Sequence, residues 1–159
     1  QKSDADAGAA DRAGRNVTYS EVHFGGAVAT FASVLADPQR LLAEYGNGPD
    51  ALVLAEVEAR AKGIGSAVFA SGVPLAALGS GIADITGRGL GVEGVPIGAT
   101  GTTLVDVLQV GGRAMPVDDA AGSRAAREGL GVDRAAFSAL TEAAKAFLVS
   151  ETILDGIED

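Results

Sequence analysis

The feature that most constrains the fold is a long glycine-rich stretch with few charges, residues 63–112. From Gly63 to Ala83 it contains no charged side chain. Glycine and alanine bury little apolar area, but they let neighbouring backbones approach closely. We therefore expect the flanking segments to fold around this stretch, or to present it to another molecule.

The N-terminal part of the chain divides into an arm and a helix. Residues 1–15 are small, polar and charged, which is typical of a flexible arm. Thr18 and Glu21 have the spacing of a capping box, so we predict that a helix begins there and runs to about residue 35. The chain would then form one folded unit over residues 16–159.

Two further helix starts precede the glycine-rich stretch. Asp37 followed by Pro38 predicts a short helix that ends near Tyr45, because Asp is a good N-cap and Pro suits the first turn. Pro49 opens the next helix. The pairs with favourable i,i+4 spacing that support this helix are Glu56–Arg60 and Glu58–Lys62.

Within the central stretch we predict a helical hairpin. The preceding helix is expected to continue over residues 64–70 after a glycine kink, and Pro74 is expected to start a second helix that runs to about residue 85. Residues 87–96 contain too many glycines for a helix, so they predict a loop or a short edge strand. Residues 102–110 fit both a helix and a strand, and we favour the helix.

Two helices are predicted after the stretch, capped by Asp118 and Asp133. The last one ends at Gly156 and carries an apolar stripe that is typical of a core face. The apolar members of this stripe are Phe137, Leu140, Ala144, Phe147, Leu148 and Leu154. The predicted fold is therefore mainly α, a single-domain helical bundle around a glycine-rich central hairpin, with minor β structure near residues 90–112 left open.

Composition excludes several classes of function. A net charge of −9 argues against a nucleic-acid surface, which needs a basic stripe. The absence of cysteine excludes thiolate catalysis and Cys-type metal sites, and one histidine cannot build a multi-histidine site, so we predict no metal and leave any cofactor unassigned. Small residues and Pro74 in the uncharged run argue against membrane insertion. Because the chain begins at Gln1, we favour a secreted or processed mature protein.

The functional hypothesis that follows is a non-catalytic structural or interaction protein, a subunit of a homo-oligomer or a larger assembly. Two observations support this hypothesis. The chain has few residues of the types that usually carry catalysis, which argues against an enzyme, and the middle of the chain offers a smooth surface of small residues. The interface residues that we predict are Gly65, Phe69, Gly72, Leu75, Gly79 and Ile82.

Two alternatives remain open. The first is a carrier for a small apolar ligand or haem, with a binding pocket formed by His23, Phe24, Phe31, Phe69 and Leu78. The second is an enzyme, or an accessory subunit of one, that uses carboxylate and threonine chemistry. That reading needs Asp84, Thr103 and Asp106 to meet in a cleft.

Overall fold

The computed structural model describes residues 2–116 and 119–155, with side chains described for residues 8–116 and 119–145. Helices dominate, and a three-stranded antiparallel sheet lies among them. In chain order the elements are α1 (Lys2–His23), α2 (Ala27–Ala32), α3 (Pro38–Leu41), the π-helix η1 (Leu42–Asn47), α4 (Gly48–Lys62), β1 (Ile64–Pro74), the 3-10 turn η2 (Leu75–Ala77), α5 (Gly79–Gly87), β2 (Leu90–Glu93), β3 (Leu104–Arg113), α6 (Ala120–Glu128) and α7 (Arg134–Asp155).

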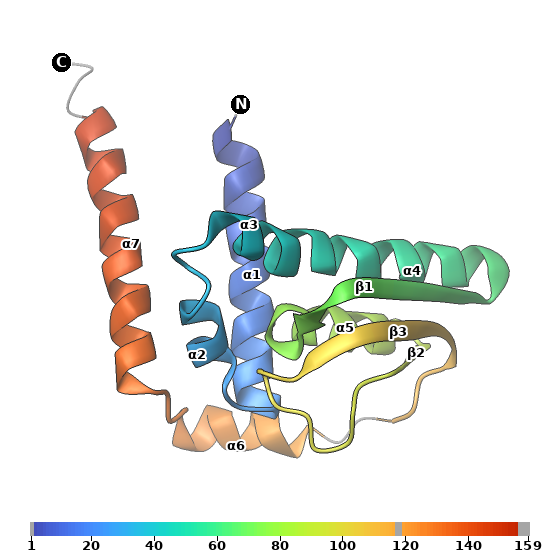
Figure 1. Cartoon of the computed structure of the whole chain (residues 1–159). Coiled ribbons are helices and arrows are strands. Elements are labelled where there is room, and N and C mark those ends of the chain that lie inside the picture. The colour runs from blue at the N-terminus through green and yellow to red at the C-terminus, as the bar shows by residue number, and fades with distance from the viewer. Residues whose placement is uncertain (1, 117–118, 156–159) are drawn as a thin grey trace.

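The sheet has the strand order β1-β3-β2, with both pairs antiparallel. Its inner face packs on α4 and α5, and its other face is open (Figure 1). Gly65 explains how close this packing is, since a Cβ there would overlap the backbone of Ala55 in α4. The core lies between this inner face, α4, α5 and α1, and it includes the fully buried side chains Leu52, Leu75, Leu78 and Leu108.

The N-terminal segment differs from the prediction. Residues 2–15, expected as an arm, are the first turns of α1, and the capping box at Thr18 lies inside this helix. The absence of bulky apolar residues did not indicate an unfolded arm, because the buried side of α1 is made of small and polar side chains. These are Ala13, Asn16, Val17 and Ser20, at helical spacing. Gly25 and Gly26, both at positive φ, separate α1 from α2, so the single helix predicted to residue 35 is wrong.

The prediction of a helical hairpin in the central stretch is also wrong. Residues 64–74 form strand β1, and only the segment after Pro74 is helical, as η2 and α5. Burial alternates along β1, with Gly65, Ala67 and Phe69 facing inward and the residues between them exposed, which is the period of a strand. The helix favoured for residues 102–110 is wrong as well, because they belong mainly to β3. For residues 87–96 a loop or a short edge strand was left open, and Leu90–Glu93 form the edge strand β2.

Predictions based on helix caps and on i,i+4 pairs agree better with the structure than the prediction of the hairpin does. The Asp37 carboxylate accepts a hydrogen bond from the Arg40 amide at 3.1 Å, as expected for an N-cap. The helix does not end near Tyr45, however, because η1 carries it without a break into α4. The predicted pairs of α4 are present, Arg60 to Glu56 at 2.7 Å and Lys62 to Glu58 at 3.0 Å.

The last two helices begin close to where the sequence placed them. Asp119 caps α6, and the Asp133 carboxylate accepts from the Ala136 amide at 2.8 Å before α7. The predicted core face of α7 is not a core face at Phe137, whose residue surface is 62% exposed. In Figure 1, α7 stands beside α2 and apart from the sheet. The predicted cap Asp118 and terminator Gly156 lie outside the described residues.

Candidate functional site

An exposed apolar surface lies on the outward face of α4. Val53, Leu54 and Val57 are 52%, 68% and 59% exposed, although each is a large aliphatic residue in the middle of a well-formed helix. At about 100° per residue, they lie on one stripe together with the exposed Ala61. We call these four residues the α4 ridge.

Charges are ordered along α4. Asp50 lies in the first turn, and Arg60 and Lys62 lie in the last turn, so each charge also complements the helix dipole. Asp50 accepts a hydrogen bond from Arg12 of α1 at 2.7 Å and remains 60% exposed. The α4 ridge therefore ends near Asp50, which is paired with Arg12, on one side and near Arg60 and Lys62, which are paired with Glu56 and Glu58, on the other.

A buried carboxylate fastens α4 to the rest of the molecule. Glu56, 8% exposed, accepts hydrogen bonds from Arg88 Nη2 at 2.6 Å and from Arg60 Nη2 at 2.7 Å. The paired guanidinium of Arg88, followed by that of Arg60, lowers the pKa of Glu56 from 4.5 to about 2, although burial works in the opposite direction. Because Arg88 directly follows α5, this network clamps α4 to α5 with the ridge facing away.

A second apolar surface lies on the open face of the sheet. Val68 of β1 pairs with Val107 of β3, and these two valines are 67% and 47% exposed. Ile64, at the start of β1, is 51% exposed. Polar Ser66 and Gln109 are interspersed between them, so this face is less continuous than the α4 ridge.

The residues predicted as an interface lie mostly inside the chain. Gly65, Phe69, Gly72, Leu75 and Gly79 are buried, and Ile82 is half-buried against the core. Gly65 approaches the backbone of α4 and Gly79 approaches the side chain of Ser20 in α1. The close backbone contacts foreseen for the glycines are thus contacts within one chain.

The residues predicted as a ligand pocket do not converge. His23 and Phe24 are neighbours at the end of α1, with ring centroids 6.5 Å apart. Phe31 packs edge-on against Tyr45 at 4.8 Å. Leu78 is fully buried in the core, and Phe69 lines a different cavity beside η1.

His23 has both ring nitrogens engaged. Nδ1 lies 2.9 Å from the Tyr19 carbonyl oxygen, and Nε2 lies 2.9 Å from Asp119 Oδ1. The ring also stacks on Tyr19 at a centroid distance of 3.8 Å. The hydrogen bond from His23, together with that from the Gly122 amide, lowers the pKa of Asp119. In this arrangement His23 presents no free nitrogen to a haem iron, and its contacts fasten α6 to α1.

The carboxylates and threonine considered for catalysis lie on separate elements. Asp84 is on α5, Asp106 is on β3, and the hydroxyl of Thr103 accepts a hydrogen bond from the Thr100 amide at 2.9 Å. Among the described residues, no group of three or more Asp, Glu or His side chains is placed to hold a metal ion. No helix of the described ranges is long and apolar enough to cross a bilayer.

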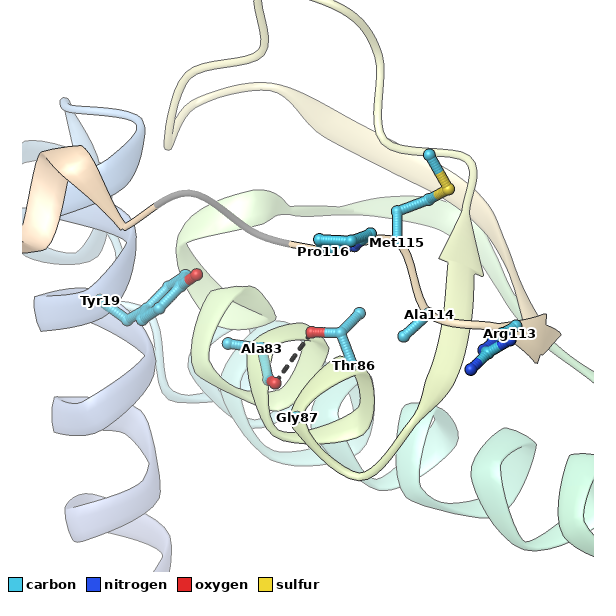
Figure 2. Close-up of a pocket in the computed structure, with 8 residues that line it drawn as sticks. All are labelled: Tyr19, Ala83, Thr86, Gly87, Arg113, Ala114, Met115 and Pro116. Atoms are coloured by element: carbon cyan, nitrogen blue, oxygen red, sulfur yellow. Dashed lines mark hydrogen bonds between the residues drawn. The ribbon is translucent and has the colours of Figure 1, made fainter.

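A further cavity of about 740 Å³ lies between α1, α5 and the segment after β3 (Figure 2). Tyr19 projects toward it from α1, and burial followed by the charges of Asp119 and Asp84 raises the pKa of this phenol. The Thr86 hydroxyl donates a hydrogen bond to the Ala83 carbonyl oxygen of the same helix, α5, at 2.9 Å (Figure 2). Among the described lining residues Arg113 is the one charged group, and we assign no chemistry to this cavity.

The comparisons with known proteins add no family to this picture. No family model, no curated protein and no solved structure matches the chain.

Proposed function

We propose that the protein is a non-catalytic structural or interaction subunit that self-associates through the α4 ridge. The observation that carries the proposal is the exposure of Val53, Leu54 and Val57 on one face of a rigid helix. Contiguous exposed apolar side chains of this kind mark interaction sites more often than isolated ones do. The occupant that we propose is the same ridge of a second copy.

The charge order along α4 favours an antiparallel pair. If Leu54 of one copy lies against Val57 of the other, a two-fold axis passes near the centre of the ridge. Asp50 then lies near Arg60 and Lys62 of the second copy, and the two helix dipoles oppose each other. A parallel pair would instead place like charges together at both ends.

The area of the ridge indicates a weak dimer. Burying the exposed part of each of its three large side chains contributes about 1–2 kcal/mol, or about 6–12 kcal/mol for the six side chains of a pair. The loss of translational and rotational freedom on association costs about 4–15 kcal/mol. With a gain in the upper part of this range, about 8–12 kcal/mol, and a cost near 4 kcal/mol, the net gain of about 4–8 kcal/mol corresponds to a dissociation constant from about 1 μM to 1 mM.

Sedimentation velocity across this concentration range tests the proposal. The wild-type protein should shift from monomer to dimer, and Leu54→Glu should remain a monomer because it buries a charge at the centre of the pair. Val68→Glu is the matched control, since Val68 is equally exposed (67%) but lies on the open face of the sheet. A wild-type monomer at every concentration, or equal effects of the two substitutions, would refute the α4 ridge as the interface.

The antiparallel arrangement has its own test. Asp50→Lys should weaken the dimer, and adding Lys62→Glu in the same chain should restore it, because the reversed charges meet again across the two-fold axis. Failure of the double substitution to restore the dimer would contradict this arrangement. Lys62→Glu alone serves as the control for the loss of its pair with Glu58.

A further inference from the structure

His23 faces an oxygen atom with each of its two ring nitrogens. Nδ1 lies 2.9 Å from the Tyr19 carbonyl oxygen, and Nε2 lies 2.9 Å from Asp119 Oδ1. A carbonyl oxygen and a carboxylate oxygen accept hydrogen bonds and do not donate them, whereas a neutral imidazole carries one N–H. The imidazolium, with two N–H groups, can donate to both oxygens at once. The geometry therefore fits the protonated form of His23.

The charge that faces the ring from the helix packed against it is Asp119. The His23 side chain is 16% exposed and that of Asp119 is 68% exposed. Within α1 the Tyr19 ring stacks on the imidazole, and burial, followed by the charges of Asp119 and of Asp84 in α5, raises the pKa of Tyr19. Helix α2 carries no charged residue. The other charged side chains on nearby turns of α1 and on α6 are engaged or exposed: Glu21 accepts a hydrogen bond from the Val28 amide, Asp11 pairs with Arg15, and Arg124, Arg127 and Glu128 are exposed.

The helix on the other side of this contact is lightly packed. α6 lies across the end of α1 (Figure 1), and none of its residues is fully buried. Its half-buried residues are Ala121, Gly122 and Ala125, which bury little apolar area. A cavity of about 660 Å³ lies between the two helices. With so little apolar packing, one hydrogen-bonded charge pair is a large share of what keeps α6 on α1.

We propose that the protonation of His23 controls the docking of α6 on α1. The imidazolium binds Asp119 and with it the start of α6, and loss of the proton leaves one of the two oxygens without a donor. Release of α6 uncovers the side of α1 that carries Thr18 and Val22. This device uses α1 and α6, and it is independent of self-association through the α4 ridge.

The docked form should be favoured at mildly acidic pH. Asp119 is ionised there, because the hydrogen bond from His23, followed by that from the Gly122 amide, lowers the pKa of Asp119 below its ordinary value of 3.8. An imidazole ordinarily releases its proton at about pH 6–7. Docking is therefore strongest below this range and weakens as the pH rises through it. For a partly exposed charge pair, we expect the undocked population to rise about two- to fivefold.

A nitroxide spin label on α6 measures the docking. The chain has no cysteine, so Arg124→Cys places a single thiol at an exposed position of α6. When α6 is docked, the label broadens the amide resonances on the facing side of α1, which include Thr18 and Val22. This broadening should be larger at about pH 5.5 than at about pH 8. Equal broadening at the two pH values would overturn the proposal.

Two variants, each combined with the spin label, assign the effect to the pair. Asp119→Asn removes the charge and keeps the N-cap of α6, because Asn caps helices as well as Asp does. His23→Gln keeps a polar side chain that does not titrate. We expect His23→Gln to abolish the change in broadening between the two pH values and Asp119→Asn to at least halve it.

The matched control is Asp133→Asn, which makes the same change at the N-cap of α7 and should keep the full pH response. Either of the two variants of the pair decides the test if the other does not fold. A full wild-type response in His23→Gln or in Asp119→Asn would overturn the assignment, as would an equal loss of the response in Asp133→Asn.

Discussion

Replacing Glu56 by glutamine should measure what the clamp between α4 and α5 contributes to stability. The carboxylate accepts hydrogen bonds from both Arg60 and Arg88, including one to each oxygen from Arg88, at 2.8 Å and 2.6 Å. Glutamine has nearly the same shape, but it offers one neutral acceptor and directs an NH₂ group at a guanidinium. The substitution therefore removes the charge pairing with little change in volume.

The expected loss of stability follows from the pKa of Glu56, which pairing with Arg88 and Arg60 lowers from 4.5 to about 2. At about 1.4 kcal/mol per pKa unit, this difference corresponds to about 3 kcal/mol. The side chains of Arg60 and Arg88 are 47% and 52% exposed, so water screens part of the interaction. We expect Glu56→Gln to lower the free energy of unfolding by about 1–3 kcal/mol at pH 7.

The contribution of Glu56 to stability should decrease as the pH falls. Because the folded-state pKa is the lower one, the stabilisation is fully present above pH 4.5, the pKa of the unfolded chain, and is lost as the pH falls from 4.5 toward about 2. The difference in stability between wild type and Glu56→Gln should be constant near neutral pH. It should shrink through this acidic range.

Urea unfolding at a series of pH values, followed by circular dichroism, measures both quantities. Glu58→Gln is the control, because it removes the same charge from the same helix but breaks an exposed pair with Lys62. That variant should lose clearly less stability than Glu56→Gln, because an exposed ion pair contributes little. Equal losses in the two variants, or a wild-type advantage over Glu56→Gln that persists at pH 2, would show that the clamp does not act as described.

Two further results are expected from other contacts. Gly65→Ala should destabilise the protein by about 1–3 kcal/mol in the same assay, because the added Cβ overlaps the Ala55 carbonyl, whereas Gly87→Ala, which meets nothing within 4 Å, should be neutral or stabilising. An equal loss in both would contradict the close packing of α4 on β1. In an NMR titration the Asp119 carboxyl should titrate below its ordinary pKa of 3.8, and His23→Ala should raise that pKa. An unchanged pKa would contradict the hydrogen bond between them.

The strands show where prediction from the sequence failed. Residues 64–74 and 104–113 are compatible with helix by composition, and each becomes a strand by pairing with the other, as Ile64 does with Gly111. The paired residues are 30 to 47 positions apart, so the composition of either segment alone does not decide between strand and helix. The glycines were read correctly as points of close approach, but whether they contact their own chain or another could not be read from their positions.

The candidate sites depend on the same kind of distant contact. The exposed side of α4 cannot be told from its sequence, because Leu52 and Leu54 look alike and only the packing buries the first. The sequence indicated instead a pocket of His23, Phe24, Phe31, Phe69 and Leu78, which the fold places apart.

What the sequence determined by itself is the set of interactions within one or two helical turns. The Asp37 and Asp133 caps and the Glu58–Lys62 pair could be foreseen, because each joins residues three or four apart. The tertiary structure alone decided that the central stretch forms a sheet, that Glu56 meets Arg88, and that the α4 ridge faces outward. Each of these depends on segments distant in sequence, whose meeting is selected by the packing of the whole chain.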